Sequence, residues 1–175
     1  LKNLGTLSKN EIVGTSMANL GLEEKLKEHS IKLIRTSVGD RYVKEEMIKK
    51  DINLGGEQSG HIILKDFNSS GDGIIVALQV LSILQEQKIK ASKALNIFTP
   101  VPQKLMNFKV KSENILDTDE TKEFLRTCEQ MINNSGRIIA RMSGTEPVLR
   151  VMIECREQNK LNELSNSVDN HFSKL

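Results

Sequence analysis

The sequence has no tryptophan and a single tyrosine, and only 3% of its 175 residues are aromatic. Its core must therefore be built from leucine, isoleucine, valine and methionine. The net charge of +2 is too small to indicate a nucleic-acid partner, and no run of lysine and arginine with interleaved aromatics is present. What remains is an ordinary globular composition, with 38% hydrophobic and 27% charged residues.

Long apolar segments are missing as well. The longest apolar stretch, residues 74–84, is interrupted by Gln79 and Ser82 and falls well short of the roughly 20 residues that span a bilayer. No signal peptide is visible. We therefore expect no membrane partner.

Cysteine is scarce, and the spacing of Cys128 and Cys155 matches no metal-binding or redox pair. We expect reduced thiols, for which the cytoplasm is the default location. The first residue is Leu1 and not methionine, and from this we expect the chain to be a piece of a longer protein.

Strand and helix patterns alternate along the first part of the chain. The expected order is strand 11–13, helix 16–28, strand 31–34, helix 41–50 with an N-cap at Gly39-Asp40, strands 52–54 and 61–64, and helix 73–87. This alternation predicts an α/β domain with a helix-covered, mixed but mainly parallel sheet. Because the first half of helix 73–87 is apolar all round, we expect it to pack on more than one side.

The pattern changes after Thr99-Pro-Val-Pro102, which cannot continue a helix and reads as an extended linker. Strand 103–111, helix 118–132, strands 137–142 and 148–155 with a short loop between them, and helix 157–172 are expected next. We therefore predict two domains, with the α/β domain at residues 1–98 and a smaller α+β domain at 103–175.

The loop from Arg141 to Arg150 has the chemistry of an oxyanion site. Ser143 and Thr145 supply hydroxyl donors, and Gly144 would let the backbone point its N–H groups inward as an anion-binding nest. Arg141 and Arg150 stand on the flanking strands, where both guanidinium groups can converge on one phosphate. The alternative is a polar hairpin turn with two surface arginines, because Ser-Gly-Thr is common in turns.

A second candidate loop, Gly55-Gly-Glu-Gln-Ser-Gly-His61, follows a predicted strand. Ligands gather at the carboxyl ends of parallel strands. There Glu57 can accept hydrogen bonds from sugar hydroxyls, and Ser59 can donate and accept them. His61 either orients Glu57 or has a supporting role. The alternative is a glycine-rich loop with incidental polar residues.

No metal site is expected. Asp72 supplies one carboxylate directly before helix 73–87, which is the position of an N-cap and not of an acidic metal loop. No second histidine or cysteine near His61 completes a ligand set.

Five segments, in order and at similar spacing, resemble the bacterial phosphoglucosamine mutases of the α-D-phosphohexomutase superfamily. They are Val13–Glu23, Val38–Val43, Gly55–His61, Ser70–Gly73 and Arg141–Met152. Five matching segments in register make a chance likeness improbable, and they favour the functional interpretation of both loops. Because the family's enzymes have four domains around a cleft, the resemblance implies that residues 1–98 are the third domain and 103–175 the fourth.

The resemblance also implies roles for individual residues of a phosphosugar site. Glu57 and Ser59 would contact sugar hydroxyls, with His61 beside them, and Asp40 and Arg41 match a loop that lines the cleft. The phosphate that is not being transferred would be held by Arg141, Ser143, Gly144, Thr145 and Arg150.

The family's catalytic serine, in a Ser-His-Asn-Pro-like motif, and its Asp-x-Asp-x-Asp magnesium loop do not occur in these residues. The chain is therefore expected to be inactive, with the N-terminal domains of the same polypeptide as partner. The whole enzyme would use magnesium and a sugar bisphosphate activator. It would interconvert glucosamine 6-phosphate and glucosamine 1-phosphate through a phosphoserine and a bisphosphate. A mutase of glucose or mannose phosphates and a stand-alone phosphosugar-binding module are the alternatives.

Overall fold

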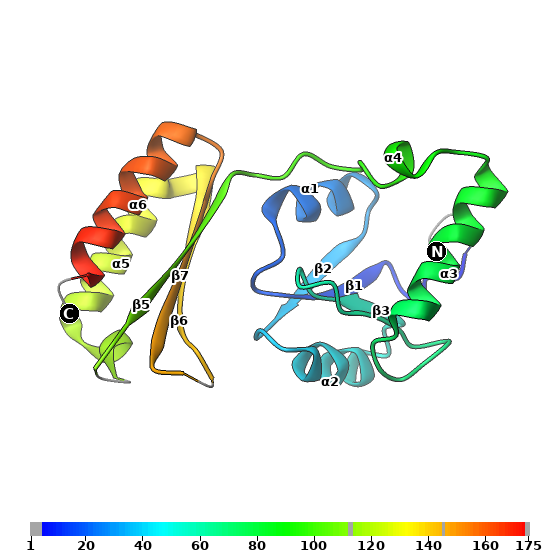
Figure 1. Ribbon diagram of the computed structural model, residues 1–175, viewed down its shortest axis with the longest axis horizontal. Helices are drawn as coiled ribbons and strands as arrows, with labels where there is room; N and C mark the ends of the chain where they lie inside the picture. The colour runs from blue at the N-terminus through cyan, green and yellow to red at the C-terminus, as the bar shows by residue number, and fades with distance from the viewer. Residues whose placement is uncertain (1–4, 112–113, 145, 174–175) are drawn as a thin grey trace. The chain divides into compact units, whose positions relative to one another are not determined.

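The structure is a computed structural model that describes residues 5–111, 114–144 and 146–173 (Figure 1). The chain divides into two compact units, Leu1–Pro100 and Val101–Leu175. Each unit has a sheet of its own.

The first unit contains a four-stranded sheet in the order β2-β1-β3-β4. Its strands are β1 (Glu11–Thr15), β2 (Lys32–Thr36), β3 (Leu54–Gly56) and β4 (Ile62–Leu64). β1 runs parallel to both of its neighbours, and β4 is antiparallel to β3. Helices α1 (Leu20–Glu28) and α2 (Asp40–Lys50) lie on opposite faces of the sheet (Figure 1). The predicted mixed, mainly parallel sheet is therefore confirmed.

Two helices of this unit begin at other residues than predicted. α1 starts at Leu20 and not near Ser16, because the side chain of Asn19 caps it by accepting the N–H of Gly21 at 2.9 Å. α2 starts at Asp40, and its N-cap is Gly39, which has no side chain to form a capping bond. The N-cap predicted at Gly39-Asp40 is therefore Gly39, and Asp40 is the first residue of the helix.

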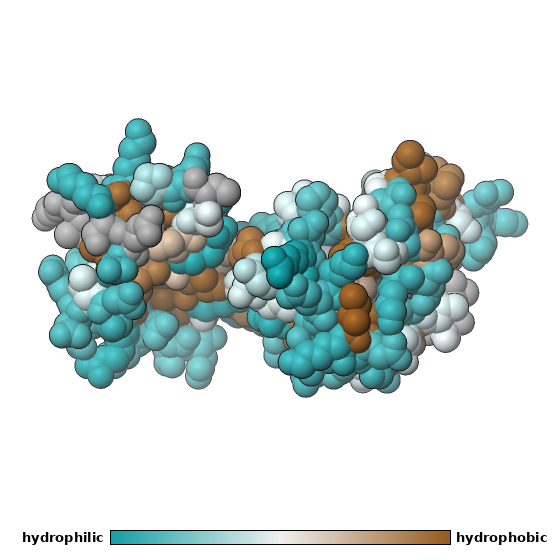
Figure 2. Space-filling view, turned by 90° about the horizontal axis from the view of Figure 1, so that it is seen from below, coloured by the Kyte–Doolittle hydropathy of each residue, from teal (hydrophilic) through white to brown (hydrophobic). Residues whose placement is uncertain are grey.

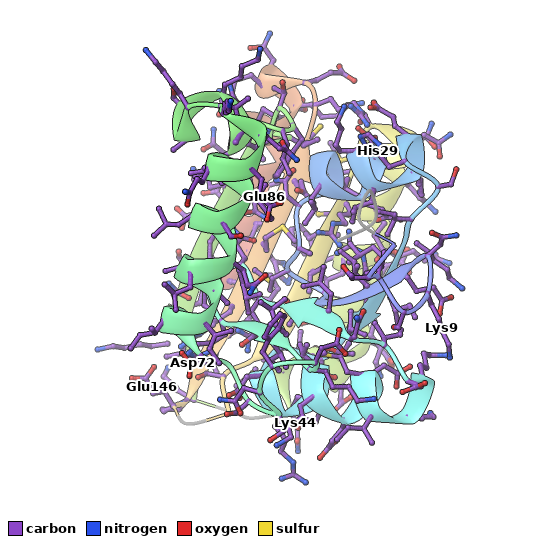
Figure 3. All side chains as sticks on the ribbon, turned by 90° about the vertical axis from the view of Figure 1, so that its right-hand side faces the viewer. Lys9, His29, Lys44, Asp72, Glu86 and Glu146 are labelled. Carbon is purple, nitrogen blue, oxygen red and sulfur yellow. The ribbon has the colours of Figure 1, made fainter. Side chains whose placement is uncertain are left out.

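Helix α3 (Gly73–Gln87) has the predicted N-cap, since Asp72 Oδ1 accepts the N–H groups of Ile74 and Ile75 at 2.9 and 3.1 Å. Figure 3 shows Asp72 at the first turn of this helix. The predicted burial on several sides was wrong. No residue of α3 is buried, and Ile74 and Leu78 are 75% and 60% exposed. Figure 2 shows hydrophobic surface in the region of this helix. Of the strands, α3 packs mainly against β4, a three-residue edge strand that offers little area to cover.

The second unit is a three-stranded antiparallel sheet in the order β5-β7-β6 with helices on one face (Figure 1). Its elements are β5 (Gln103–Lys109), α5 (Asp119–Ile132), β6 (Gly136–Met142), β7 (Val148–Cys155) and α6 (Gln158–Phe172). Short helices α4 (Ala91–Ala94), η2 (Ile115–Asp117) and η3 (Asn133–Ser135) complete the chain. α6 buries Leu161, Leu164, Val168 and Phe172, which recur at helical spacing and cover the core.

Both cysteines are buried in the core of this unit and neither forms a disulfide. Burial raises the pKa of the Cys128 thiol, which keeps it protonated. In the described ranges, every helix is too short or too polar to cross a membrane.

Candidate functional site

Arg141 and Arg150 face each other directly across the β6–β7 ladder. Along β7 the alternate residues Leu149 and Val151 belong to the core beneath the helices. Arg150 therefore points to the opposite, helix-free face, together with its register partners Arg141 and Asn107. Two guanidinium groups and one amide form a polar row at the hairpin end of the sheet.

The charges of this row are not balanced within the ladder. Like charges directly opposite each other destabilise a sheet, so an anion between the two arginines would stabilise it. The buried Nε of Arg150 has no hydrogen-bond partner among the described residues. One Nη of Arg150 lies 3.6 Å from a carboxylate oxygen of Glu146, an exposed ion pair. The row is thus a cationic surface with donor capacity to spare, as an oxyanion requires.

The loop between the strands differs in part from the expected nest. The N–H of Ser143 donates to the carbonyl of Val148 at 2.8 Å and closes the hairpin, so it does not point at a ligand. Gly144 has no positive φ, and a Cβ there would meet nothing within 4 Å, so its backbone does not require glycine. Thr145 lies outside the described residues. Of the predicted donors in this loop, the N–H of Ser143 is therefore used within the hairpin.

In the first unit, the carboxyl ends of the parallel strands bring three loops to one edge of the sheet. α1 connects β1 to β2, and α2 connects β2 to β3. Because β2 and β3 flank β1 on opposite sides, the chain reverses its direction across the sheet at β1. In open α/β sheets, the crevice at such a reversal of direction is where ligands bind. The Glu57–His61 loop follows β3 at this edge, as predicted.

Glu57 is held firmly in that loop. Its side chain is only 9% exposed, and its Oε1 accepts the N–H of Gly39 at 2.9 Å. Its Oε2 lies 3.6 Å from Nδ1 of His61, whose side chain is 65% exposed. Ser59 is exposed. The structure thus brings Glu57 and His61 together and joins their loop to the residue before α2.

Asp40 and Arg41 lie on the first turn of α2. Oδ1 of Asp40 accepts the N–H of Arg41 at 2.8 Å, and Nε of Arg41 donates to Glu45 at 2.7 Å. This hydrogen bond to Glu45 raises the pKa of Arg41. Both residues thus lie on a helix and not on the predicted loop, and the guanidinium of Arg41 donates to Glu45 along this helix.

One residue that the sequence analysis missed is Arg35, at the end of β2. Its Nη1 donates to the carbonyls of Thr15, Ser16 and Ala18 at 3.3, 3.4 and 2.7 Å, so it holds the loop that follows β1. Its Nη2 lies 2.8 Å from Glu23. Burial raises the pKa of Glu23, but hydrogen bonds from Arg35 and Lys27 outweigh it and lower that pKa below its usual value. No spacing in the sequence indicates contacts this distant.

A metal centre is not formed by the part of the chain that the structure describes, since no three His, Cys, Asp or Glu side chains gather there.

Comparison with known proteins assigns both units to one family. Residues 1–101 match the phosphoglucomutase/phosphomannomutase alpha/beta/alpha domain III, and residues 105–171 match the C-terminal domain of the same family. The chain belongs to the phosphoglucomutase/phosphomannomutase family. The resemblance seen in the sequence is thereby confirmed.

Curated members of this family are similar along nearly the whole chain. Phosphoglucosamine mutase of Nitrobacter winogradskyi is 46% identical over 167 residues, which are 95% of this chain and 37% of that protein. The enzyme of the same name from Clostridium botulinum strain Kyoto is 44% identical over 171 residues, which are 96% of this chain and 38% of that protein. The chain thus spans little more than a third of the length of these relatives.

Solved structures of the family share the fold. The substrate complex of an N-acetylglucosamine-phosphate mutase matches with a TM-score of 0.75 at 23% identity, over 91% of this chain and 38% of that one. The Aspergillus fumigatus N-acetylphosphoglucosamine mutase, in complex with GlcNAc-6P and magnesium, matches with a TM-score of 0.77 at 19% identity, over 95% and 42%. At these identities the likeness concerns the fold alone.

Proposed function

We propose that this chain is the substrate-holding part of a phosphoglucosamine mutase, an enzyme that interconverts glucosamine 6-phosphate and glucosamine 1-phosphate. The observation that carries the proposal is the direct opposition of Arg141 and Arg150 on the helix-free face of the sheet. The 46% identity to curated phosphoglucosamine mutases supports the choice of sugar.

In this proposal Arg141 and Arg150 hold the phosphate that is not being transferred. The guanidinium groups of Arg141 and Arg150 donate to its oxygens, and the Ser143 hydroxyl adds a neutral donor. Gly144 and Thr145 belong to the same site. Because the sugar bisphosphate must present either end in turn, this site accepts both the 1-phosphate and the 6-phosphate.

The Glu57 loop reads the sugar hydroxyls in the same proposal. Glu57 is fixed by Gly39, so a hydroxyl donor meets a carboxylate that is already oriented, which limits the entropy lost on binding. Ser59 contacts the sugar from the exposed part of the loop, and His61 supports Glu57. Asp40 and Arg41 line the cleft beside them.

The transfer itself needs groups that we assign to the N-terminal domains of a longer polypeptide. There a phosphoserine would carry the phosphoryl group, and magnesium would neutralise the charge that develops on it. The described residues gather no ligand set for this metal. We place the enzyme in the cytoplasm and expect this chain alone to bind phosphosugar weakly and to turn none over.

Two assays test the proposal. The 175-residue chain should show no turnover of glucosamine 1-phosphate with magnesium and glucosamine 1,6-bisphosphate present. Measurable turnover would contradict the assignment of the transfer step to the N-terminal domains. The polypeptide extended to the length of its relatives should convert glucosamine 1-phosphate in strong preference to glucose 1-phosphate. A preference for the glucose compound would replace the proposed substrate.

A further inference from the structure

Glu146 places a negative charge inside the loop that we propose to bind phosphate. Its backbone is fixed, because its carbonyl accepts the N–H of Val148 at 2.7 Å within the hairpin turn. Its side chain is 61% exposed, and Oε2 lies 3.6 Å from Nη2 of Arg150. Figure 3 shows Glu146 at this end of the second unit. The carboxylate is thus anchored close to the arginines and is still free to change rotamer.

The position of this carboxylate matches an electrostatic need of the unliganded sheet. Arg141 and Arg150 are register partners, so their positive charges repel each other when no anion is bound. Glu146 pairs with one of them and offsets part of that repulsion. A phosphate that approaches the same guanidinium groups meets a like-charged group already in place.

We propose that Glu146 is a built-in counter-ion of the Arg141–Arg150 pair, which an incoming phosphate must displace. This inference rests on the proposed function, because it assumes that the arginine pair is the phosphate site. An exposed side chain leaves such a pair at little cost, since exposed ion pairs are weak. Displacement therefore permits binding but lowers affinity and hastens release.

Weak, reversible binding suits a site that must release one phosphate and then bind the other. Two arginines facing each other without a competing carboxylate would hold a phosphate dianion more tightly and release it more slowly. Glu146 sets the affinity of the site for phosphate in the range where both binding and release occur.

The test compares the wild-type chain with Glu146→Gln. The amide keeps the shape of the side chain and leaves the backbone bond to Val148 in place, and it removes only the charge. Titration with inorganic phosphate, followed by NMR, should give a Kd roughly three- to fivefold lower for E146Q. Glu163→Gln is the matched control, because Glu163 is an exposed glutamate of α6 in the same unit, and its Kd should equal that of the wild type.

A second readout follows from linkage. Without phosphate E146Q should melt at a slightly lower temperature than the wild type. Saturating phosphate should raise the Tm of E146Q by more than it raises the Tm of the wild type. An equal or higher Kd for E146Q, with measurable binding by the wild type, overturns the role of Glu146 and leaves the phosphate site standing. If neither protein binds phosphate, the site itself is wrong and the inference falls with it.

Discussion

The two ends of the β6–β7 ladder differ in the charge of the residue that faces an arginine. At one end Arg137 faces Glu154, with Nε donating to the carboxylate at 2.6 Å, and Glu154 is completely buried. At the hairpin end Arg141 faces Arg150, and both are cations. The four side chains lie on the same face of the same two strands, because their register positions have the same parity. The first pair is balanced within the sheet, whereas the second is the pair that we propose to bind an external anion.

The largest expected effect concerns the end that is neutralised internally. Glu154→Ala leaves Arg137, which is only 19% exposed, beside an empty position in the sheet. The free energy of unfolding, measured by urea denaturation, should fall by about 2–4 kcal/mol. The Kd for phosphate should be unchanged, because the hairpin end is left intact. A large loss of phosphate binding without a loss of stability would show that the two ends are not separate.

The reverse pattern is expected at the hairpin end. Arg150→Ala should raise the Kd for inorganic phosphate roughly ten- to hundredfold, the equivalent of about 1.5–3 kcal/mol. Unfolding without phosphate should be unchanged or slightly harder, since a like-charge contact is removed. Arg126→Ala, on the exposed surface of α5, is the control and should leave the Kd unaltered. A drop in stability with an unchanged Kd would make Arg150 a structural residue.

The sequence could predict the arginine pair because hairpins are local. The strands were expected at 137–142 and 148–155, and a hairpin that closes between Ser143 and Val148 places Arg141 opposite Arg150. The backbone of the loop did not follow from composition, because the Ser143 N–H completes the ladder and does not point at a ligand. The pairing of the two strands could be predicted because it is local along the chain. That the N–H of Ser143 is used within the hairpin could not be predicted from the sequence.

The first unit shows the limit of such predictions. Glu57 was found by its place after a strand, but its partner is the N–H of Gly39, which no periodicity indicates. The same holds for Arg35 and the carbonyl of Ala18. Helix α3 was predicted at its observed limits, yet its apolar composition did not reveal how little of the sheet it covers. Side-chain contacts between distant elements depend on the tertiary fold.

A third change extends the comparison to the Glu57 loop. Gly39 has a φ of +135°, and a Cβ there would lie 3.2 Å from the ring of Tyr42. Gly39→Ala should therefore reduce the free energy of unfolding by about 1–2 kcal/mol. Gly73→Ala is the control, because no atom lies within 4 Å of its Cβ position and its φ is not positive, so it should be neutral or mildly stabilising. Equal effects of the two substitutions would exclude a special backbone at Gly39.

The smallest effect concerns the Arg35–Glu23 pair, the counterpart of Arg137–Glu154 in the first unit. The folded chain lowers the pKa of Glu23 below the ordinary value of 4.5. This pair therefore stabilises the fold above that value, and its contribution is lost as the pH falls through the lowered pKa. Glu23→Gln should cost about 1 kcal/mol near pH 7, and the difference from the wild type should vanish in acid. A difference that is independent of pH would contradict a role for the charge.

The central claim is that the facing arginines form one anion site, and titration of the chain with inorganic phosphate tests it most directly. Backbone NMR signals of residues 141–144 and 150 should shift together along one saturable curve, and sodium chloride should weaken the binding. Signals around the Arg137–Glu154 pair should stay in place. Phosphate-induced shifts that spread over unrelated lysines, or none that saturate at the hairpin end, would contradict the account.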